Sequence, residues 1–138
     1  MTQDLLAIVL DTLLPGDGAW PSARAVDLAQ AVRADVDGDP ERQIDIVLAA
    51  LPSGFARDDV ETREAALRAI EVAHGAAFER LVTLAYTAYY IEPRVRDVIE
   101  RETGYENRPP QPLGYALEPF DERLLDKQRQ RAPFWRRT

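Results

Sequence analysis

The sequence predicts an all-α protein: a bundle of five or six short helices with a long Pro/aromatic-rich C-terminal tail. Two observations lead to this prediction. Apolar residues recur at helical spacing through the first hundred residues, and no strand-like alternation of useful length interrupts them. Proline and glycine punctuate these segments, and five of the ten prolines then gather within residues 109–133.

A turn-forming segment separates the first two predicted helices. Leucines and a valine at helical spacing predict the first helix over residues 5–14, and Pro15-Gly16-Asp17-Gly18 ends it. Ser22 is the expected N-cap of a second helix that runs to about Val36. The residues expected to face inward from the second helix are Val26, Leu28, Ala29 and Val32.

Aspartates mark the starts of the third and fourth helices. Asp39 can cap the third helix, because Pro40 suits its first position. Asp58 or Asp59 can cap the fourth helix, and the acids that follow suit the positive end of the helix dipole. The expected inward residues are Ile44, Val47, Leu48 and Leu51 from the third helix and Val60, Leu67 and Ile70 from the fourth.

Gly75 either breaks the helical pattern or is tolerated within it. The fifth helix then presents Phe78, Leu81, Val82, Ala85 and Tyr89 inward. Pro93 starts a sixth helix, and Gly104 resembles a glycine C-cap. We therefore predict a helical bundle over residues 1–104 and an extended tail over 105–138, with one short helix near 121–131.

Composition and charge narrow the function classes. The chain has no cysteine, which excludes disulfides, thiolate chemistry and covalent c-type haem attachment. Residues 1–120 carry 11 arginines and 21 acids, so an acidic body argues against a nucleic-acid surface. No apolar run approaches the ~20 residues of a membrane span, and the start lacks the basic region of a secretory signal. We expect no membrane association and a cytoplasmic location.

Catalytic and metal-binding patterns are weak. His74 follows Glu71 at the spacing of a helical metal-ligand pair, but the chain has no second histidine with which to build a di-iron site. A packed or interface histidine is the expected role. Paired acids such as Asp58 and Asp59 fit helix starts and solvated faces. We therefore predict no catalytic, cofactor-binding or metal site in this chain.

The positive signal is the stretch from Tyr86 to Tyr115, which holds five of the eleven aromatic residues and four of the ten prolines. Tyr89 and Tyr90 diverge by about 100° around a helix, so both cannot face one core. Tyrosine, tryptophan and arginine carry much of the energy of protein interfaces. Two interpretations remain open: this segment completes the chain's own bundle, or it docks on a partner protein.

Short motifs in a particular order carry a family resemblance. They are Leu13-Leu14-Pro15-Gly16-Asp17, Trp20-Pro21-Ser22-Ala23, Phe78 with Leu81, Tyr89-Tyr90 with Pro93, Gly104-Tyr105, and Pro110-Gln111-Pro112-Leu113-Gly114-Tyr115. This set spans residues 5–115. It resembles the gluconate 2-dehydrogenase subunit 3 family, the small subunits of FAD-dependent glucose–methanol–choline-type dehydrogenases and oxidases.

The resemblance implies a helical, non-catalytic subunit that binds and stabilises a large FAD-dependent sugar or alcohol oxidoreductase. FAD and the catalytic histidine would belong to the large subunit. Many family members carry a twin-arginine signal, which is missing here, so a cytoplasmic complex is expected. The expected partner contacts are Tyr89, Tyr90, Pro93, Tyr105, Pro110, Pro112, Tyr115, Phe120 and Trp135.

Two other functions are kept as alternatives. One is a homo-oligomeric helical enzyme that uses an acid such as Glu71 with His74. The other is a protein-binding adaptor that has no flavin partner. Turnover by the isolated chain, lost in a His74→Ala variant, would favour the first, and a pull-down would separate the second from the oxidoreductase subunit.

Overall fold

The computed structural model describes residues 4–34, 39–106, 114 and 118–131. Contacts divide the chain into two units, Met1–Asn107 and Arg108–Thr138. The described residues are helical and form no strand, apart from one isolated bridge between Asp17 and Trp20. The predicted all-α fold is therefore confirmed.

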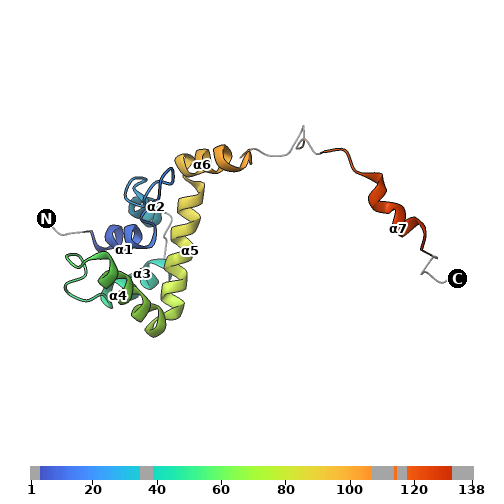
Figure 1. The fold of residues 1–138 in the computed structure, drawn as a ribbon. Helices are drawn as coiled ribbons and strands as arrows, with labels where there is room; N and C mark the ends of the chain where they lie inside the picture. Colours follow the sequence, from blue (N-terminus) through green and yellow to red (C-terminus); the bar gives the residue numbers. More distant parts are fainter. Residues whose placement is uncertain (1–3, 35–38, 107–113, 115–117, 132–138) are drawn as a thin grey trace. The chain divides into compact units, whose positions relative to one another are not determined.

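The described residues of the first unit form six α-helices, in the order shown in Figure 1. They are α1 (Leu5–Leu13), α2 (Leu28–Ala34), α3 (Asp39–Ala49), α4 (Val60–Ala73), α5 (Gly75–Ile91) and α6 (Pro93–Thr103). The described part of the second unit holds the 3₁₀ turn Glu122–Leu125 and the short helix α7 (Asp126–Arg129).

Helix α5 is the central element of the first unit. It packs against α2, α3, α4 and α6, whereas α1 packs against α2 and α4. In Figure 1 it runs lengthwise past the other helices of this unit. An apolar sequence of 17 residues without proline accounts for its length. The last turn of α5 therefore has side chains in the core, such as Tyr89, and side chains on the surface, such as Tyr90.

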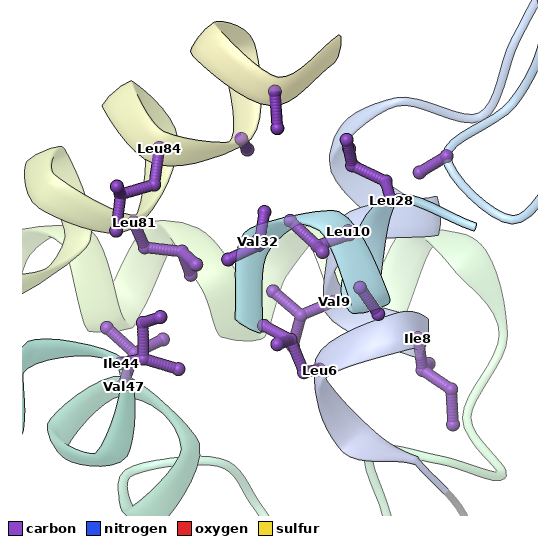
Figure 2. Packing of buried hydrophobic residues seen from close by; sticks show 14 of the residues in the cluster. Leu6, Ile8, Val9, Leu10, Leu28, Val32, Ile44, Val47, Leu81 and Leu84 are labelled. Atoms are coloured by element: carbon purple, nitrogen blue, oxygen red, sulfur yellow. The ribbon is translucent and has the colours of Figure 1, made fainter. Parts of the chain in front are cut away.

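The core consists of aliphatic side chains from every helix of the first unit, and Figure 2 shows part of it. Leu10 of α1, Val32 of α2, Val47 of α3 and Leu81 of α5 are all fully buried. The inward residues predicted from helical spacing are mostly found here. Val60 is an exception, since it is the first residue of α4 and is 59% exposed. The neighbouring large side chain that is buried is Phe55, from the loop before α4.

The second predicted helix begins later than expected. The Ser22 hydroxyl does accept a hydrogen bond from the Ala25 amide (3.2 Å), as a cap would. However, Asp27 has φ +52°, a left-handed conformation that interrupts a helical path. Helix α2 therefore starts at Leu28, and residues 23–27 form turns whose Val26 side chain is nevertheless buried.

The other helix boundaries follow local chemistry. Asp59 is the cap of α4, because its carboxylate accepts a hydrogen bond from the Thr62 amide (2.8 Å). Gly75 marks a break, since His74 ends α4 and precedes α5. Gly104 closes α6 with φ +70°, as predicted. No helix among the described residues is both long and apolar enough to cross a membrane.

Candidate functional site

Tyr89 is directed into the first unit from the last turn of α5. Its side chain is only 4% exposed, and its hydroxyl donates a hydrogen bond to the Pro21 carbonyl oxygen (2.7 Å). Burial raises the pKa of the Tyr89 hydroxyl above its ordinary value, and the Tyr90 hydroxyl acts in the same direction. Tyr89 therefore ties α5 to the loop before α2 and offers almost no surface to a partner.

Tyr90, the next residue, is directed to the outside and is 50% exposed. Its ring meets the Tyr89 ring edge-on, with centroids 5.5 Å apart and planes at 81°. It also stacks on Tyr86, one helical turn earlier, at 6.0 Å and 24°. Since residues four apart share one helix face, Tyr86 and Tyr90 form a continuous exposed aromatic surface. The structure thus separates the two adjacent tyrosines into an inward anchor and an outward ring.

A pocket of about 150 Å³ opens beside Tyr90. Its lining comes from three places: Tyr90 on α5, Arg96 and Ile99 on α6, and Tyr105 just after the end of α6. Tyr105 is 59% exposed, and its amide donates a hydrogen bond to the Thr103 hydroxyl (3.1 Å). We call Tyr86, Tyr90 and Tyr105, with the pocket that Tyr90 and Tyr105 border, the tyrosine surface.

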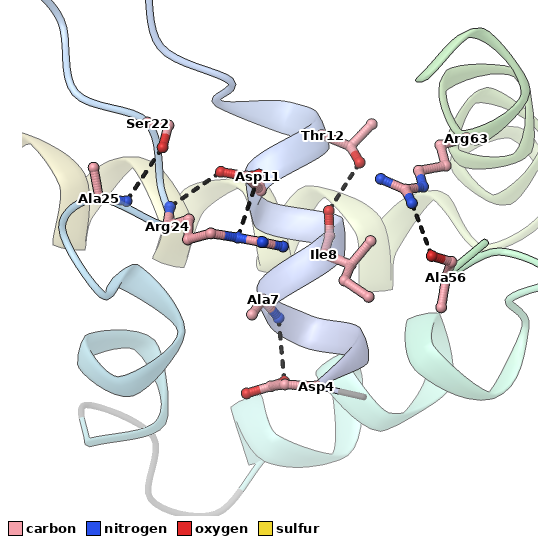
Figure 3. A network of polar contacts seen from close by, with 10 residues as sticks. All are labelled: Asp4, Ala7, Ile8, Asp11, Thr12, Ser22, Arg24, Ala25, Ala56 and Arg63. Carbon is pink, nitrogen blue, oxygen red and sulfur yellow. Dashed lines mark hydrogen bonds and ion pairs between the residues drawn. The ribbon is translucent and has the colours of Figure 1, made fainter. Parts of the chain in front are cut away.

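The loop over residues 15–27 supports this end of the molecule. Besides Tyr89, Arg94 of α6 reaches it and donates a hydrogen bond to the Ala25 carbonyl. On the other side Asp11 of α1 accepts a hydrogen bond from the Arg24 amide (3.1 Å) and pairs with its guanidinium (3.6 Å), as shown in Figure 3. Contacts from α1, α5 and α6 therefore fix one loop, and they fix the α5–α6 junction to it.

Gly16 makes the tight path of this loop feasible. It has φ +79°, and a Cβ added there would lie 2.6 Å from the Ser22 backbone nitrogen and 2.8 Å from the Trp20 carbonyl oxygen. Only glycine avoids both the left-handed strain and this overlap. Gly18 also has a positive φ, +55°, but no atom lies within 4 Å of the corresponding position.

The predicted contact residues fall into four groups. Tyr90, Pro93 and Tyr105 are exposed on the first unit, and Pro93 is the first residue of α6. Phe120 is 63% exposed within the second unit. Tyr89 is buried and is left out of the surface. The remaining predicted contacts lie outside the described residues; they are Pro110, Pro112, Tyr115 and Trp135.

Glu71 and His74 do not form a common site. Glu71 borders a pocket of about 290 Å³ between α1, α4 and α5, together with Thr12, Arg68 and Phe78. His74 borders a different pocket of about 310 Å³ beside α3. The expected role of His74 was a packed or interface histidine; it is exposed and so is not packed in the chain's own core, and the interface role stays a prediction. Across the described ranges no three or more His, Cys, Asp or Glu side chains are grouped as metal ligands.

Two arginines that the sequence reasoning did not single out have structural importance. Arg63 donates hydrogen bonds to the carbonyl oxygens of Phe55 (2.9 Å) and Ala56 (2.8 Å), the second of which appears in Figure 3. It also lies over the Phe55 ring at 6.0 Å. Arg96 lines the tyrosine surface. An arginine on a polar helix face usually reads as solvated, so no sequence signal distinguishes either residue.

Comparisons with protein-family models, with curated proteins and with solved structures find no match for this chain. The geometry described above is therefore the main basis for a functional proposal, together with the ordered motifs of the sequence.

Proposed function

We propose that this chain is a non-catalytic accessory subunit that binds and stabilises a large FAD-dependent sugar or alcohol oxidoreductase subunit. The observation that carries the proposal is the tyrosine surface. Tyr86, Tyr90 and Tyr105 expose about half of their side-chain area at the end of the central helix. Large aromatic side chains that gather on a surface are typical anchors of protein interfaces.

A second observation supports the proposal. The motifs on which the family resemblance rests are far apart in the sequence, yet two of them are in contact. Pro21, from the motif Trp20-Pro21-Ser22-Ala23, accepts the hydrogen bond from Tyr89, from the motif Tyr89-Tyr90 with Pro93. If these motifs serve one function, some of them are expected to contribute to the same part of the structure.

In the proposed complex, this chain supplies binding energy and no chemistry. FAD and the reacting groups would belong to the larger subunit. An obligate interface of this kind usually buries at least about 2,000 Å² in total. On the first unit, the tyrosine surface and Pro93 would contact the partner. Phe120 would be a separate contact from the second unit.

Co-expression tests the proposal. The chain is produced together with the products of the neighbouring genes and purified through a tag on the small chain, and the bound flavin is measured by absorbance. We expect stoichiometric flavoprotein with the unaltered chain and at least a roughly tenfold loss with Tyr90→Glu, because an interface anchor contributes 2 kcal/mol or more.

Val72→Glu is the matched control. Val72 is 88% exposed on α4, distant in sequence from the tyrosine surface, so a charge there should leave capture unchanged. Circular dichroism checks that both variants keep their helices. Absence of flavoprotein with the unaltered chain, or equal capture by Tyr90→Glu, would contradict the proposal.

A further inference from the structure

The pocket of the tyrosine surface has the size of one small ring. Its volume is about 150 Å³, and a cavity of roughly that volume is enough to hold benzene. Among the described residues, the apolar part of its lining comes from Tyr90, Ile99 and Tyr105. Flat aromatic walls and one aliphatic side chain suit an apolar ring better than a polar group.

Arg96 adds a charge to this apolar pocket. Its side chain is half-buried, and within the described residues it forms no side-chain hydrogen bond or ion pair. Two acids lie one helical turn away, but Glu92 pairs with Arg94 (3.2 Å) and Glu100 makes no ion pair with Arg96. A guanidinium without an ion pair among the described residues, beside a ring-sized pocket, favours a carboxylate next to that ring.

We propose that this pocket binds a proline ring from an extended segment of the partner protein, while Arg96 pairs with a carboxylate of a neighbouring residue in that segment. This inference rests on the proposed function, in which the segment belongs to the oxidoreductase subunit. Extended proline-rich segments dock on aromatic-lined grooves because their backbone loses little entropy on binding. The carboxylate matches the charge of Arg96 and sets the position of the segment.

Two blocked peptides test the inference on the full chain. The first is acetyl-Pro-Pro-Glu-Pro-Pro-amide, and the second has glutamine in place of glutamate. Binding is followed in amide proton–nitrogen correlation spectra of the isotope-labelled chain. We expect both peptides to shift the amides of Tyr90, Ile99 and Tyr105, and the glutamate peptide to bind about threefold more tightly, as a partly exposed ion pair would allow.

Matched arginine variants identify the charge partner. Arg96→Gln should make the two peptides equal in affinity while retaining the binding of the ring. Arg101→Gln, an exposed arginine later in α6, should retain the preference for glutamate. Tyr90→Ala should weaken both peptides. Added salt should reduce the glutamate preference, because an exposed ion pair is screened.

Three results would overturn the inference: no shift at the pocket with millimolar peptide, equal affinity of the two peptides for the unaltered chain, or the same loss of preference in Arg101→Gln. These results are independent of flavoprotein capture. Flavoprotein capture without peptide binding would overturn the pocket inference and leave the proposed function. Peptide binding without flavoprotein capture would overturn the proposed function and leave a pocket that binds a proline-rich segment.

Discussion

The Tyr89 hydroxyl and the Pro21 carbonyl oxygen, 68 residues apart in the chain, are joined by a 2.7 Å hydrogen bond. This bond closes the loop before α2 onto the end of the central helix. Tyr89 lies on the buried face of α5, and because adjacent residues of a helix are separated by about 100°, Tyr90 faces outward. The inward anchor and the exposed aromatic ring are therefore set by the same helix.

Tyr89→Phe should destabilise the fold by about 1–2 kcal/mol, because the Pro21 carbonyl oxygen loses its buried donor while the ring remains. Urea unfolding followed by circular dichroism measures the change. Tyr90→Phe is the control, and it should be almost neutral because the ring is half-exposed and its hydroxyl makes no hydrogen bond within the described residues. Equal effects of the two variants would mean that the Tyr89 hydrogen bond does not contribute.

Gly16→Ala and Gly18→Ala should differ although both glycines have a positive φ. Alanine at residue 18 should cost about 1–2 kcal/mol, the strain of a left-handed residue alone. Alanine at residue 16 should cost clearly more, because its Cβ would overlap backbone atoms of Trp20 and Ser22. Thermal or urea unfolding compares the two. Similar losses would show that the loop moves to accept the extra methyl group.

Arg63→Met should destabilise the unit by about 2–3 kcal/mol. The variant keeps an apolar side chain over Phe55 but leaves the carbonyl oxygens of Phe55 and Ala56 without their charged donor. Arg68→Met, one of the more exposed positions of the same helix, is the control and should change stability by less than about 0.5 kcal/mol. Urea unfolding curves measure the free energy of unfolding of both variants. Equal losses in the two would contradict a specific contribution of Arg63.

Asp4 and Arg33 should give the fold a small dependence on acid pH. Two hydrogen bonds from Arg33 (2.6 and 2.8 Å) hold the pKa of the Asp4 carboxyl below its ordinary value, and the Ala7 amide adds to this. A lowered pKa stabilises the fold above the unfolded-state pKa, and this stabilisation disappears as the pH falls through the folded-state pKa.

The matching variant is Asp4→Asn. It should lower stability near neutral pH by less than about 1 kcal/mol, since both side chains are partly exposed. The difference from the unaltered chain should disappear as the pH falls through the folded-state pKa of Asp4, below which the carboxyl is protonated in both states. A difference that persists there would assign the effect to the cap of α1 instead of the charge.

Local signals explain which helices could be predicted. Pro93, Gly104 and Asp59 determine helix ends through their own conformations and hydrogen bonds, so their roles were readable from the sequence. The start of α2, in contrast, could not be predicted from the sequence. The left-handed Asp27 lies in a loop held by Asp11, Tyr89 and Arg94, and such contacts between distant residues leave no local pattern.

The candidate site was partly predictable for the same reason. Tyr89 shares the helical phase of Phe78 and Ala85, which indicates an inward direction, and Tyr90 must then diverge. The pocket required coordinates, because Arg96, Ile99 and Tyr105 meet Tyr90 only through the angle between α5 and α6. Arg96 in particular has no distinguishing feature in the sequence.

The two hydrogen bonds that fix the α5–α6 junction to the loop over residues 15–27 have an energetic consequence for binding. Tyr89 fixes the last turn of α5, and Arg94 fixes the first turn of α6 to the same loop. Stacking on Tyr86 restricts the Tyr90 ring further. When a partner docks here, few side-chain rotations of this chain remain to be restricted. Less of the contact energy would therefore be offset by lost conformational entropy. Weakening the loop should then reduce affinity even when every contacting side chain is retained.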